Sequence, residues 1–226
     1  MTNDIPKYAI IVAGGSGSRM LSAVPKQFLL LGGLPVLMHT IRAFHQSKSR
    51  PQIILVLPRN FHLYWQDLCV KHDFHIRHQL VNGGETRFQS VKNGLDTITD
   101  ANTIIAVQDA VRPLTDMDII DHSYTYAAEH GNAVVAVKSR DSVRQLKNNQ
   151  SVCLVRDEIY LVQTPQTFQS AQLKKAYEQP YHAKFTDDAS VVEETGIAIN
   201  LIEGNYKNIK ITFPEDIAIA EVLMRN

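Results

Sequence analysis

Glycines and basic residues gather directly after the first apolar run of the sequence. Ile10-Ile11-Val12-Ala13 leads into Gly14-Gly15-Ser16-Gly17-Ser18-Arg19, and Lys26 follows Pro25. Because glycines let backbone N–H groups approach an anion closely, such a turn at the end of a strand can cradle a phosphate. The cations Arg19 and Lys26 beside it suit a triphosphate. A tight strand–helix turn with solvated basic side chains is the alternative that these residues alone leave open.

The spacing of these glycines fits neither of two common nucleotide-binding loops. A Walker A loop would need a glycine where Arg19 stands, and a dinucleotide fingerprint would need one where Met20 stands. The acidic ribose ligand expected about 20 residues further on is also absent, because Leu34-Pro35-Val36 occupies that place. The sequence therefore disfavours an NAD(P)-dependent oxidoreductase.

A carboxylate is expected at a second strand end. Asp109 follows the apolar run 104–107, which places it at the carboxyl end of a central strand, where open α/β sheets bind ligands. Such a carboxylate can hold Mg²⁺ or a substrate hydroxyl. A turn-forming aspartate ahead of Pro113 is the alternative.

Gly83 and Gly84 follow a further expected strand and precede an expected helix. Two glycines can admit the flat edge of a base, and Ser90 adds a hydroxyl, although a glycine turn before a capped helix accounts for the same residues. Further polar residues lie near other expected strand ends, and each taken singly is more typical of a surface position: Arg156, Thr164, Thr186, Asp187 and Lys210.

The composition is that of an ordinary globular protein without overall charge. Of 226 residues, 44% are hydrophobic, and 23 Lys and Arg balance 23 Asp and Glu, which excludes disorder and disfavours nucleic-acid or membrane-surface binding. No apolar run approaches the roughly 18–20 residues of a membrane span. Because no signal peptide is evident and Cys69 and Cys153 form no CxxC motif, we expect a cytoplasmic location.

Histidines recur near the middle of the chain at His72, His75 and His78. No Cys or Glu completes a zinc set there, so a solvated polar linker is favoured over a metal site. Cys69 lies between Leu68 and Val70 and is expected to pack in the core.

Short apolar runs alternate with longer amphipathic segments over the first two thirds of the chain, a pattern typical of βαβ units around a parallel sheet. Strands are expected at residues 8–13, 52–57, 76–81, 103–107 and 133–137, and helices at 36–44, 61–72, 87–96 and 116–129. Thr115 is expected to cap the last of these helices and Gly131 to end it.

After residue 137 the rhythm changes to short strands at 142–146, 151–155 and 159–163, with a polar turn at 147–150. This pattern predicts an arm of about residues 139–160 that packs on another subunit, or else an antiparallel extension of the same sheet. The pattern alone leaves both open.

The end of the chain returns to mixed structure. A helix at 187–194 capped by Thr186, a strand at 198–202 and a final helix through Met224 are expected, the last opened by a capping box from Thr212 to Glu215. No linker divides the chain, so residues 1–226 are expected to form one domain.

Taken together, five segments resemble the 2-C-methyl-D-erythritol 4-phosphate cytidylyltransferase family over nearly the whole chain. They are residues 13–20 with Pro25-Lys26-Gln27, Asp109-Ala110-Val111-Arg112-Pro113, Thr164-Pro165-Gln166, Thr186-Asp187-Asp188-Ala189 and Asn208-Ile209-Lys210-Ile211-Thr212. The resemblance implies a Rossmann-like nucleotidyltransferase fold of the α/β class, with a mostly parallel twisted sheet flanked by helices and a projecting β-arm that clasps a homodimer. It also implies Mg²⁺-dependent transfer of CMP from CTP to 2-C-methyl-D-erythritol 4-phosphate, in isoprenoid precursor synthesis.

The resemblance further implies roles for individual residues. Arg19, Lys26 and Lys210 would be catalytic, acting on the phosphates of CTP. The nucleotide would be bound by Ala13, Gly14, Gly15, Gly17, Gly84, Glu85 and Ser90. The acceptor would be bound by Asp109, Arg112, Ser142, Arg156, Thr164, Thr186 and Asp187, with Arg112 and Ser142 reaching across from the other subunit, and Asp109 is also the candidate metal ligand.

The chain departs from the family at a few positions. It has Ala13-Gly14-Gly15 where Ala-Ala-Gly is common, Gln108 where His is common and Ser142 where Thr is common. A sister family of similar fold, which makes CDP-ribitol from D-ribitol 5-phosphate, tolerates several of these differences and is the alternative. A non-catalytic nucleotide-binding protein is a third possibility, against which the presence of both Lys26 and Lys210 argues.

Overall fold

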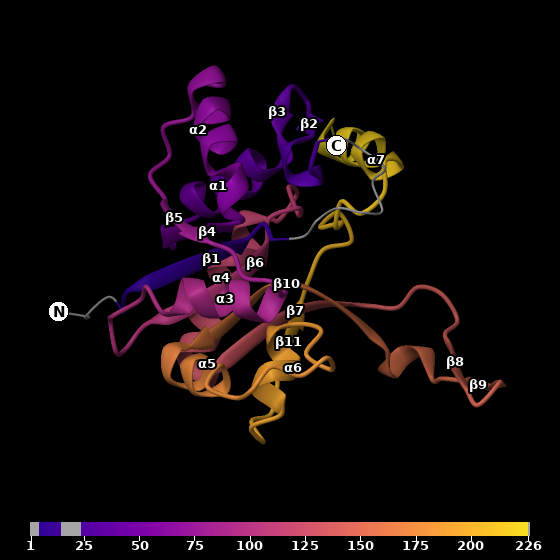
Figure 1. Ribbon diagram of the computed structural model, residues 1–226. Coiled ribbons are helices and arrows are strands. Elements are labelled where there is room, and N and C mark those ends of the chain that lie inside the picture. Colours follow the sequence, from indigo (N-terminus) through magenta and orange to yellow (C-terminus); the bar gives the residue numbers. More distant parts are fainter. Residues whose placement is uncertain (1–4, 15–23, 226) are drawn as a thin grey trace.

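A seven-stranded sheet runs through the computed structural model, which describes residues 5–14 and 24–225 (Figure 1). Its strands lie in the order β11-β7-β10-β6-β1-β4-β5. Their bounds are Lys7–Val12 for β1, Gln52–Leu57 for β4, Gln79–Asn82 for β5, Ile104–Asp109 for β6, Asn132–Lys138 for β7, Tyr160–Gln169 for β10 and Leu201–Glu203 for β11. Only β10 is antiparallel to its neighbours in this sheet, so the predicted mostly parallel sheet is confirmed.

Helices cover both faces of the sheet because the central strands are apolar on both sides. Along β1, Ala9 and Ile11 face one core cluster while Ile10 and Val12 face the other. The first cluster takes residues from α1 (Val36–Gln46), α2 (His62–Lys71) and α4 (Met117–His130). The second takes residues from α3 (Arg87–Leu95), α5 (Ser170–Ala176) and α6 (Asp188–Glu193).

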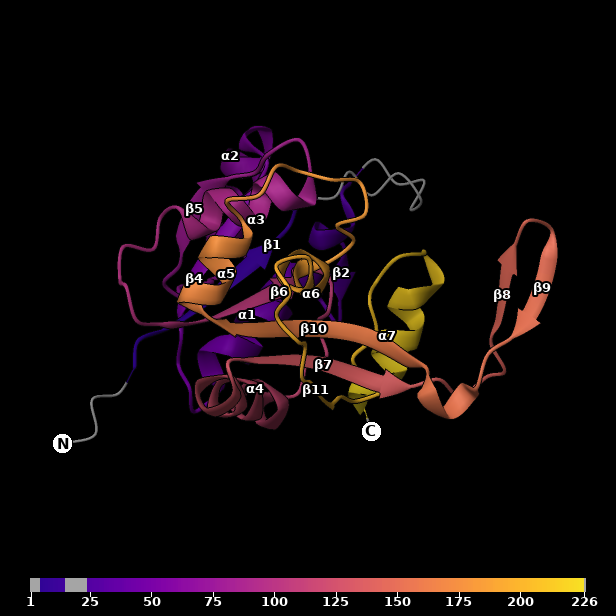
Figure 2. The same ribbon diagram turned by 90° about the horizontal axis from the view of Figure 1, so that it is seen from below.

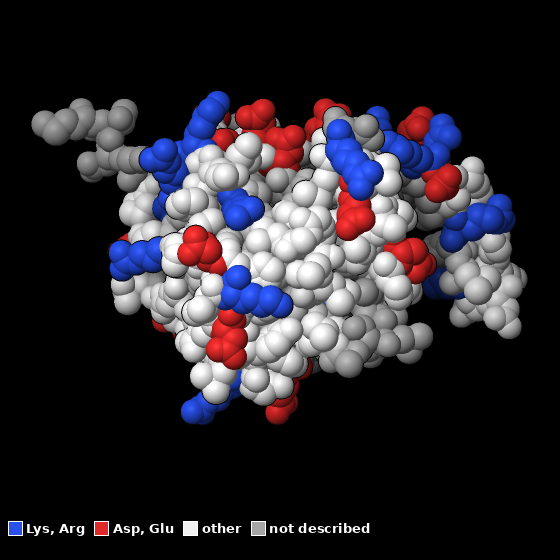
Figure 3. Space-filling view, turned by 90° about the horizontal axis from the view of Figure 1, so that it is seen from above, with Lys and Arg blue, Asp and Glu red and all other residues white. Residues whose placement is uncertain are grey.

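A smaller cluster joins the C-terminal helix to an early hairpin. Strands β2 (Leu30–Leu31) and β3 (Leu34–Pro35) pair with each other, and α7 (Glu215–Arg225) packs near them through Ala220. Three short 3₁₀ turns complete the described elements: Lys26–Phe28, Arg59–Phe61 and Arg156–Glu158. Basic and acidic side chains are interspersed on the face shown in Figure 3, in keeping with the balanced composition.

Several predicted boundaries need correction. The cap of α4 is Asp116, whose carboxylate accepts from the Asp118 N–H, while Thr115 is buried and donates to the Arg112 carbonyl. The cap of α6 is likewise Asp187 and not Thr186. Aspartate serves as an N-cap at least as well as threonine, so each helix begins one residue later than expected. Gly131 does end α4, with a φ of 94°.

The C-terminal capping box is also absent. The Asp216 carboxylate, rather than that of Glu215, accepts hydrogen bonds from the N–H groups of Thr212 and Phe213, at 2.7 and 2.8 Å. Helix α5 was not expected, and β5 begins at Gln79 rather than residue 76.

The predicted arm divides into two parts. Strands β8 (Arg144–Lys147) and β9 (Gln150–Cys153) pair only with each other, every residue in them is exposed, and the hairpin stands away from the body (Figure 2). Asn148 and Asn149 close it with φ angles of 51° and 60°, the left-handed geometry of a tight hairpin turn. Residues from Tyr160 onward instead pair with β7, so the sheet is extended as well.

Candidate active site

A cavity of about 400 Å³ opens at the carboxyl ends of β1 and β6. Its walls come from the segment after β1, the turn at Lys26, the start of α3 and the end of β6; they include Ala13, Gly14, Lys26, Gln27, Glu85, Thr86, Arg87, Asp109 and Lys210. The Gln27 side-chain amide donates to the Ala13 carbonyl at 3.1 Å, which fixes the Lys26 turn against the end of β1. The cavity therefore combines most of the predicted nucleotide-binding residues that the structure describes.

A second, smaller cavity of about 160 Å³ adjoins the first, because Arg87, Asp109 and Lys210 line both. Its other walls come from the loop after β6, from β10 and from the residues before α6, and include Arg112, Gln163, Thr164, Gln166, Thr186 and Asp187. Most of the residues that the resemblance assigned to the acceptor therefore meet in one place. Two polar cavities with a shared wall suit two substrates that must react with each other.

Asp109 occupies the shared wall with cations around its carboxylate. Lys210 Nζ lies 2.8 Å and Arg112 Nε 3.5 Å from Oδ2, and Arg87 Nε lies 3.7 Å from Oδ1. Burial alone would raise the pKa of Asp109, but Arg87, Lys210 and Arg112 together hold it well below its usual range. Asp109 is therefore a carboxylate throughout the physiological pH range.

The backbone around Asp109 is fixed by β10. The Asp109 N–H donates to Thr164 Oγ1 at 3.1 Å, and Asn208 donates from its side-chain amide to the Thr164 carbonyl at 2.9 Å. Thr164, Asp109 and Asn208 are all buried. The buried Thr164 hydroxyl thus positions the end of β6. Thr164 also lines the smaller cavity, named the acceptor-side cavity after the residues that the resemblance assigns to the acceptor.

Arg112 lies within this same site, so the expectation that it reaches across from another subunit is wrong. Its side chain is buried, and a terminal nitrogen donates to the Asn208 carbonyl at 2.7 Å. Burial lowers the pKa of Arg112, an effect that the Asp109 carboxylate opposes. A buried guanidinium held in this way presents a fixed positive charge to the smaller cavity.

The turn before α3 is held open by glycines. The Gly84 N–H donates to Ser90 Oγ at 3.0 Å, and that hydroxyl donates to the Thr86 carbonyl at 2.9 Å. A Cβ on Gly84 would lie 2.4 Å from the Gln89 Cβ, so only glycine fits. Ser90 is therefore buried behind the turn and supports the wall of the larger cavity instead of lining it.

The remaining predicted residues fall into three groups: residues outside both cavities, residues outside the described ranges, and Asp187. Ser142 and Arg156 are exposed on the arm and line neither cavity. Arg19, Gly15 and Gly17 lie outside the described residues. Asp187 lines the acceptor-side cavity, but one of its oxygens accepts from the Ser190 N–H and the other from the Gln166 side-chain amide.

The sequence reasoning missed Arg87 and Asp188. Arg87 lines both cavities, and its guanidinium makes two hydrogen bonds to the carboxylate of Asp188. Both residues stand at the first positions of helices, directly after the caps Thr86 and Asp187. The available signal was that Asp188 lies within the quoted segment 186–189 and that Arg87 closely follows Gly83 and Gly84.

The family model of 2-C-methyl-D-erythritol 4-phosphate cytidylyltransferase matches residues 8–226. The chain belongs to this family. The enzyme of that name from Bacteroides fragilis is 46% identical over 218 residues, covering 96% of this chain and 99% of the relative. The one from Bacteroides thetaiotaomicron is 47% identical and covers 95% and 98%.

Solved structures of the family share the fold. The 4-diphosphocytidyl-2C-methyl-D-erythritol synthase of Anaerococcus prevotii is 27% identical, with a TM-score of 0.84 over 99% of this chain and 98% of that one. The predicted α/β fold is confirmed, and the chain is a nucleotidyltransferase.

The candidate Mg²⁺ ligand does not stand in a metal-binding set. The part of the chain that the structure describes contains no group of three His, Cys, Asp or Glu that could hold a metal ion. Asp109 is the one carboxylate on the shared wall, and cations contact both its oxygens. These neighbours disfavour a metal ion held by protein side chains alone, although Mg²⁺ in such sites commonly relies on substrate phosphates and water.

In the histidine-rich segment, His78 packs among aromatic side chains while His75 is exposed. Trp65 Nε1 donates to His78 Nε2 at 2.9 Å, and Phe74 packs edge-on against Trp65. Cys69 is half-buried against the core, as expected, and burial raises the pKa of its thiol to about 11. Of the helices described here, none has the length and apolar character that crossing a bilayer requires.

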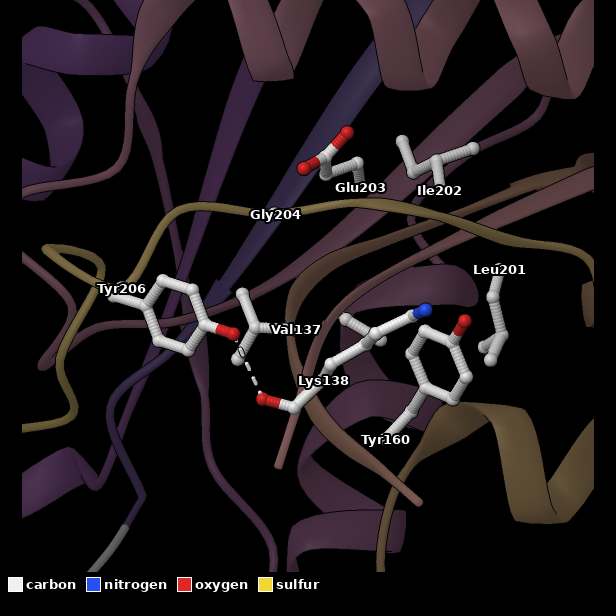
Figure 4. Close-up of a pocket in the computed structure, with 9 residues that line it drawn as sticks. Val137, Lys138, Tyr160, Leu201, Ile202, Glu203, Gly204 and Tyr206 are labelled. Atoms are coloured by element: carbon white, nitrogen blue, oxygen red, sulfur yellow. Dashed lines mark hydrogen bonds between the residues drawn. The ribbon is translucent and has the colours of Figure 1, made fainter. Parts of the chain in front are cut away.

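A separate cavity of about 620 Å³ lies at the base of the arm, beside the edge strand β11 (Figure 4). The rings of Tyr160 and Tyr206 stand on either side of Lys138, whose carbonyl accepts from the Tyr206 hydroxyl at 2.9 Å. Both rings and Leu201 are substantially exposed, so this cavity is open and partly apolar.

Proposed function

We propose that this protein transfers CMP from CTP to 2-C-methyl-D-erythritol 4-phosphate, giving 4-CDP-2-C-methyl-D-erythritol and pyrophosphate, a step in isoprenoid precursor synthesis. The observation that carries the proposal is the pair of adjoining cavities that share Arg87, Asp109 and Lys210. The relatives reported above bear the name of this activity over nearly their full length. The D-ribitol 5-phosphate alternative is not favoured.

The reaction needs no protein base. The second pKa of a phosphate monoester is about 6, so the acceptor phosphate is already largely dianionic at neutral pH. One of its oxygens forms a bond to the α-phosphorus of CTP, and the bond from that phosphorus to the oxygen bridging to the β-phosphate breaks, releasing pyrophosphate. The protein must gather two anions and neutralise the charge that develops between them.

The residues that line the two cavities fit this task. Lys26 lies in the larger cavity and Lys210 on the shared wall, where they meet the triphosphate and the phosphate that attacks it. Arg112 supplies a fixed positive charge to the acceptor side. Asp109 accepts from a hydroxyl of the polyol and keeps Lys210 in place at 2.8 Å.

We also propose that Mg²⁺ enters with CTP and is held chiefly by phosphate oxygens and water. A bound Mg²⁺ would neutralise phosphate charge and favour the departure of pyrophosphate. Because cations surround Asp109, we place most of the Mg²⁺ ligands on the substrate phosphates.

We also propose a cytoplasmic location, because the two cysteines, Cys69 and Cys153, form no CxxC motif and no disulfide framework.

A homodimer through the arm is part of the proposal. Ser142 and Arg156 lie on the arm away from both cavities of their own subunit, as they would if they served a partner's site. Leu146, Val152 and Val155 are 71%, 56% and 61% exposed, an apolar surface of the kind that protein contacts cover. The open cavity at the arm's base adds the exposed side chains of Tyr160, Leu201 and Tyr206.

Pyrophosphate release tests the activity. Protein and Mg²⁺ are mixed with each of the four NTPs in turn and with 2-C-methyl-D-erythritol 4-phosphate or D-ribitol 5-phosphate. Release with CTP and the methylerythritol acceptor is expected. Release with the ribitol acceptor alone would move the chain to the sister activity, and none with either would refute the proposal.

Analytical ultracentrifugation tests the dimer. Replacing residues 144–153 by a short glycine-serine loop removes the exposed hairpin and leaves the sheet intact, so monomers are expected. An unchanged dimer would contradict an arm-mediated contact.

A further inference from the structure

The guanidinium of Arg87 lies between two carboxylates on the wall that both cavities share. Its terminal nitrogens donate to Asp188 Oδ1 and Oδ2 at 3.0 and 2.6 Å. Its remaining nitrogen, Nε, lies 3.7 Å from Asp109 Oδ1. All three nitrogens of Arg87 therefore face protein carboxylates.

Asp188 is a buried anchor for this arrangement. Its side chain is 0% exposed, and the Tyr177 hydroxyl also donates to Oδ1, at 2.6 Å. Tyr177 is itself buried and stacks on Phe88 with 4.6 Å between ring centroids. A carboxylate without solvent is stable only when it is fully paired, so Arg87 and Asp188 hold each other in one geometry.

The pair reaches the reacting groups through Asp109. Arg87 approaches one oxygen of that carboxylate, while Lys210 and Arg112 approach the other. Cations on both sides fix the rotation of the carboxylate. The same pair ties the start of α3, which bounds the larger cavity, to the start of α6, which bounds the smaller one.

We propose that Arg87 and Asp188 form a positioning pair that orients the Asp109 carboxylate toward the acceptor, and that Arg87 does not itself bind substrate phosphate. This inference rests on the proposed function, because it assigns Asp109 to the acceptor. Two of the five N–H donors of Arg87 bond to a buried carboxylate, and Nε faces Asp109, so the guanidinium is held in one orientation as a support for Asp109.

Steady-state kinetics with each substrate varied separately test the pair. In Arg87→Lys, a single ammonium group replaces the planar guanidinium and cannot contact the carboxylates of both Asp188 and Asp109. We expect KM for the acceptor to rise at least tenfold and KM for CTP to change less than threefold. Asp188→Asn should show the same split. Lys92→Gln, which removes an exposed ion pair on the same helix, is the matched control and should behave as the wild type.

A further variant separates positioning from folding. The double variant Arg87→Gln with Asp188→Asn has two neutral side chains that can still form a hydrogen bond with each other. This double variant is measured in place of Asp188→Asn if that single variant does not fold. A raised KM for the acceptor in the folded double variant supports positioning. A wild-type KM for the acceptor in that variant would show that the charges serve folding alone, which overturns the inference.

The remaining outcomes are also decisive. An equal or larger rise in KM for CTP would mean that Arg87 binds the nucleotide phosphates, and unchanged constants in Arg87→Lys would remove the pair from the reaction. Either result overturns the inference while an active wild type leaves the proposed function standing. A wild type that is inactive with both acceptors refutes the proposed function, and this inference with it.

Discussion

Asp109→Asn isolates the charge at the centre of the site, because asparagine keeps the shape and removes the carboxylate. The Asp109 side chain is 11% exposed, and its loss would leave Lys210, Arg112 and Arg87 without the anion that all three approach. Removing one partner of a buried ion pair lowers the free energy of unfolding by about 3–5 kcal/mol. Because Lys210 is partly exposed, we expect Asp109→Asn to lower it by about 3 kcal/mol. For a chain of this length that corresponds to a melting temperature lower by about 6–12 °C.

The effect should depend on pH in a defined direction. The pKa of Asp109 is lower in the folded protein than its unfolded value of about 3.9. A depressed folded pKa stabilises the protein above the unfolded value, and this contribution is lost as the pH falls below about 4 toward the folded pKa. The stability difference between wild type and Asp109→Asn should therefore be full at pH 7 and narrow below about pH 4.

Thermal and urea unfolding at pH 7 and below about pH 4 measure the difference in stability between the wild type and Asp109→Asn. Asp96→Asn is the matched control, because its carboxylate is 62% exposed and pairs at 3.6 Å with Lys92 at the end of the same helix. It should cost about 0.5 kcal/mol or less. An Asp109→Asn variant as stable as the wild type at pH 7, or a difference that grows on acidification, would refute the electrostatic reasoning.

Three other changes have expected outcomes. Lys26→Ala should lower kcat by about 10²–10³-fold with the fold intact, because one preorganised charge on the phosphates is lost; a loss under about threefold would remove its catalytic role. Gly84→Ala should raise KM for CTP and lower the melting temperature, since the new Cβ would lie 2.4 Å from that of Gln89, and wild-type values would contradict this. Cys69 has a thiol pKa raised to about 11, so its alkylation in the native protein, followed by mass spectrometry, should be slow at pH 8 and accelerate as the pH rises toward 11.

The fold could be predicted where burial dictates sequence. Strand β4 covers residues 52–57 as expected, because a strand buried on both faces is a continuous apolar run, here bounded by Pro51 and Pro58. The hairpin turn at Asn148 and Asn149 could likewise be located, since asparagine tolerates positive φ.

Other features depend on packing that no local pattern records. The strand expected at 159–163 continues to Gln169 by shifting register between Val162 and Gln166, where the missing N–H of Pro165 is accommodated. Thr115 was expected to cap α4, but its hydroxyl bonds to the Arg112 carbonyl and to the Asn208 side chain, so Asp116 caps the helix instead.

The candidate site shows the same division. Asp109, Lys26 and Lys210 could be named because they stand in segments that resemble the family, and the structure brings them to one cavity. Arg87 and Asp188 are distant in the sequence, and their pairing follows from how two helices dock on the sheet. Without that docking, each is simply a charged residue at the start of a helix.

Strand β10 connects the exposed arm directly to the wall of the acceptor-side cavity. The strand begins at Tyr160, at the foot of the arm, and within a few residues carries Gln163 and Thr164 along the acceptor-side wall. The Thr164 hydroxyl on this strand accepts from the Asp109 N–H, so a change in the path of β10 would also move the end of β6. Changes in the arm should therefore alter how tightly the acceptor is held.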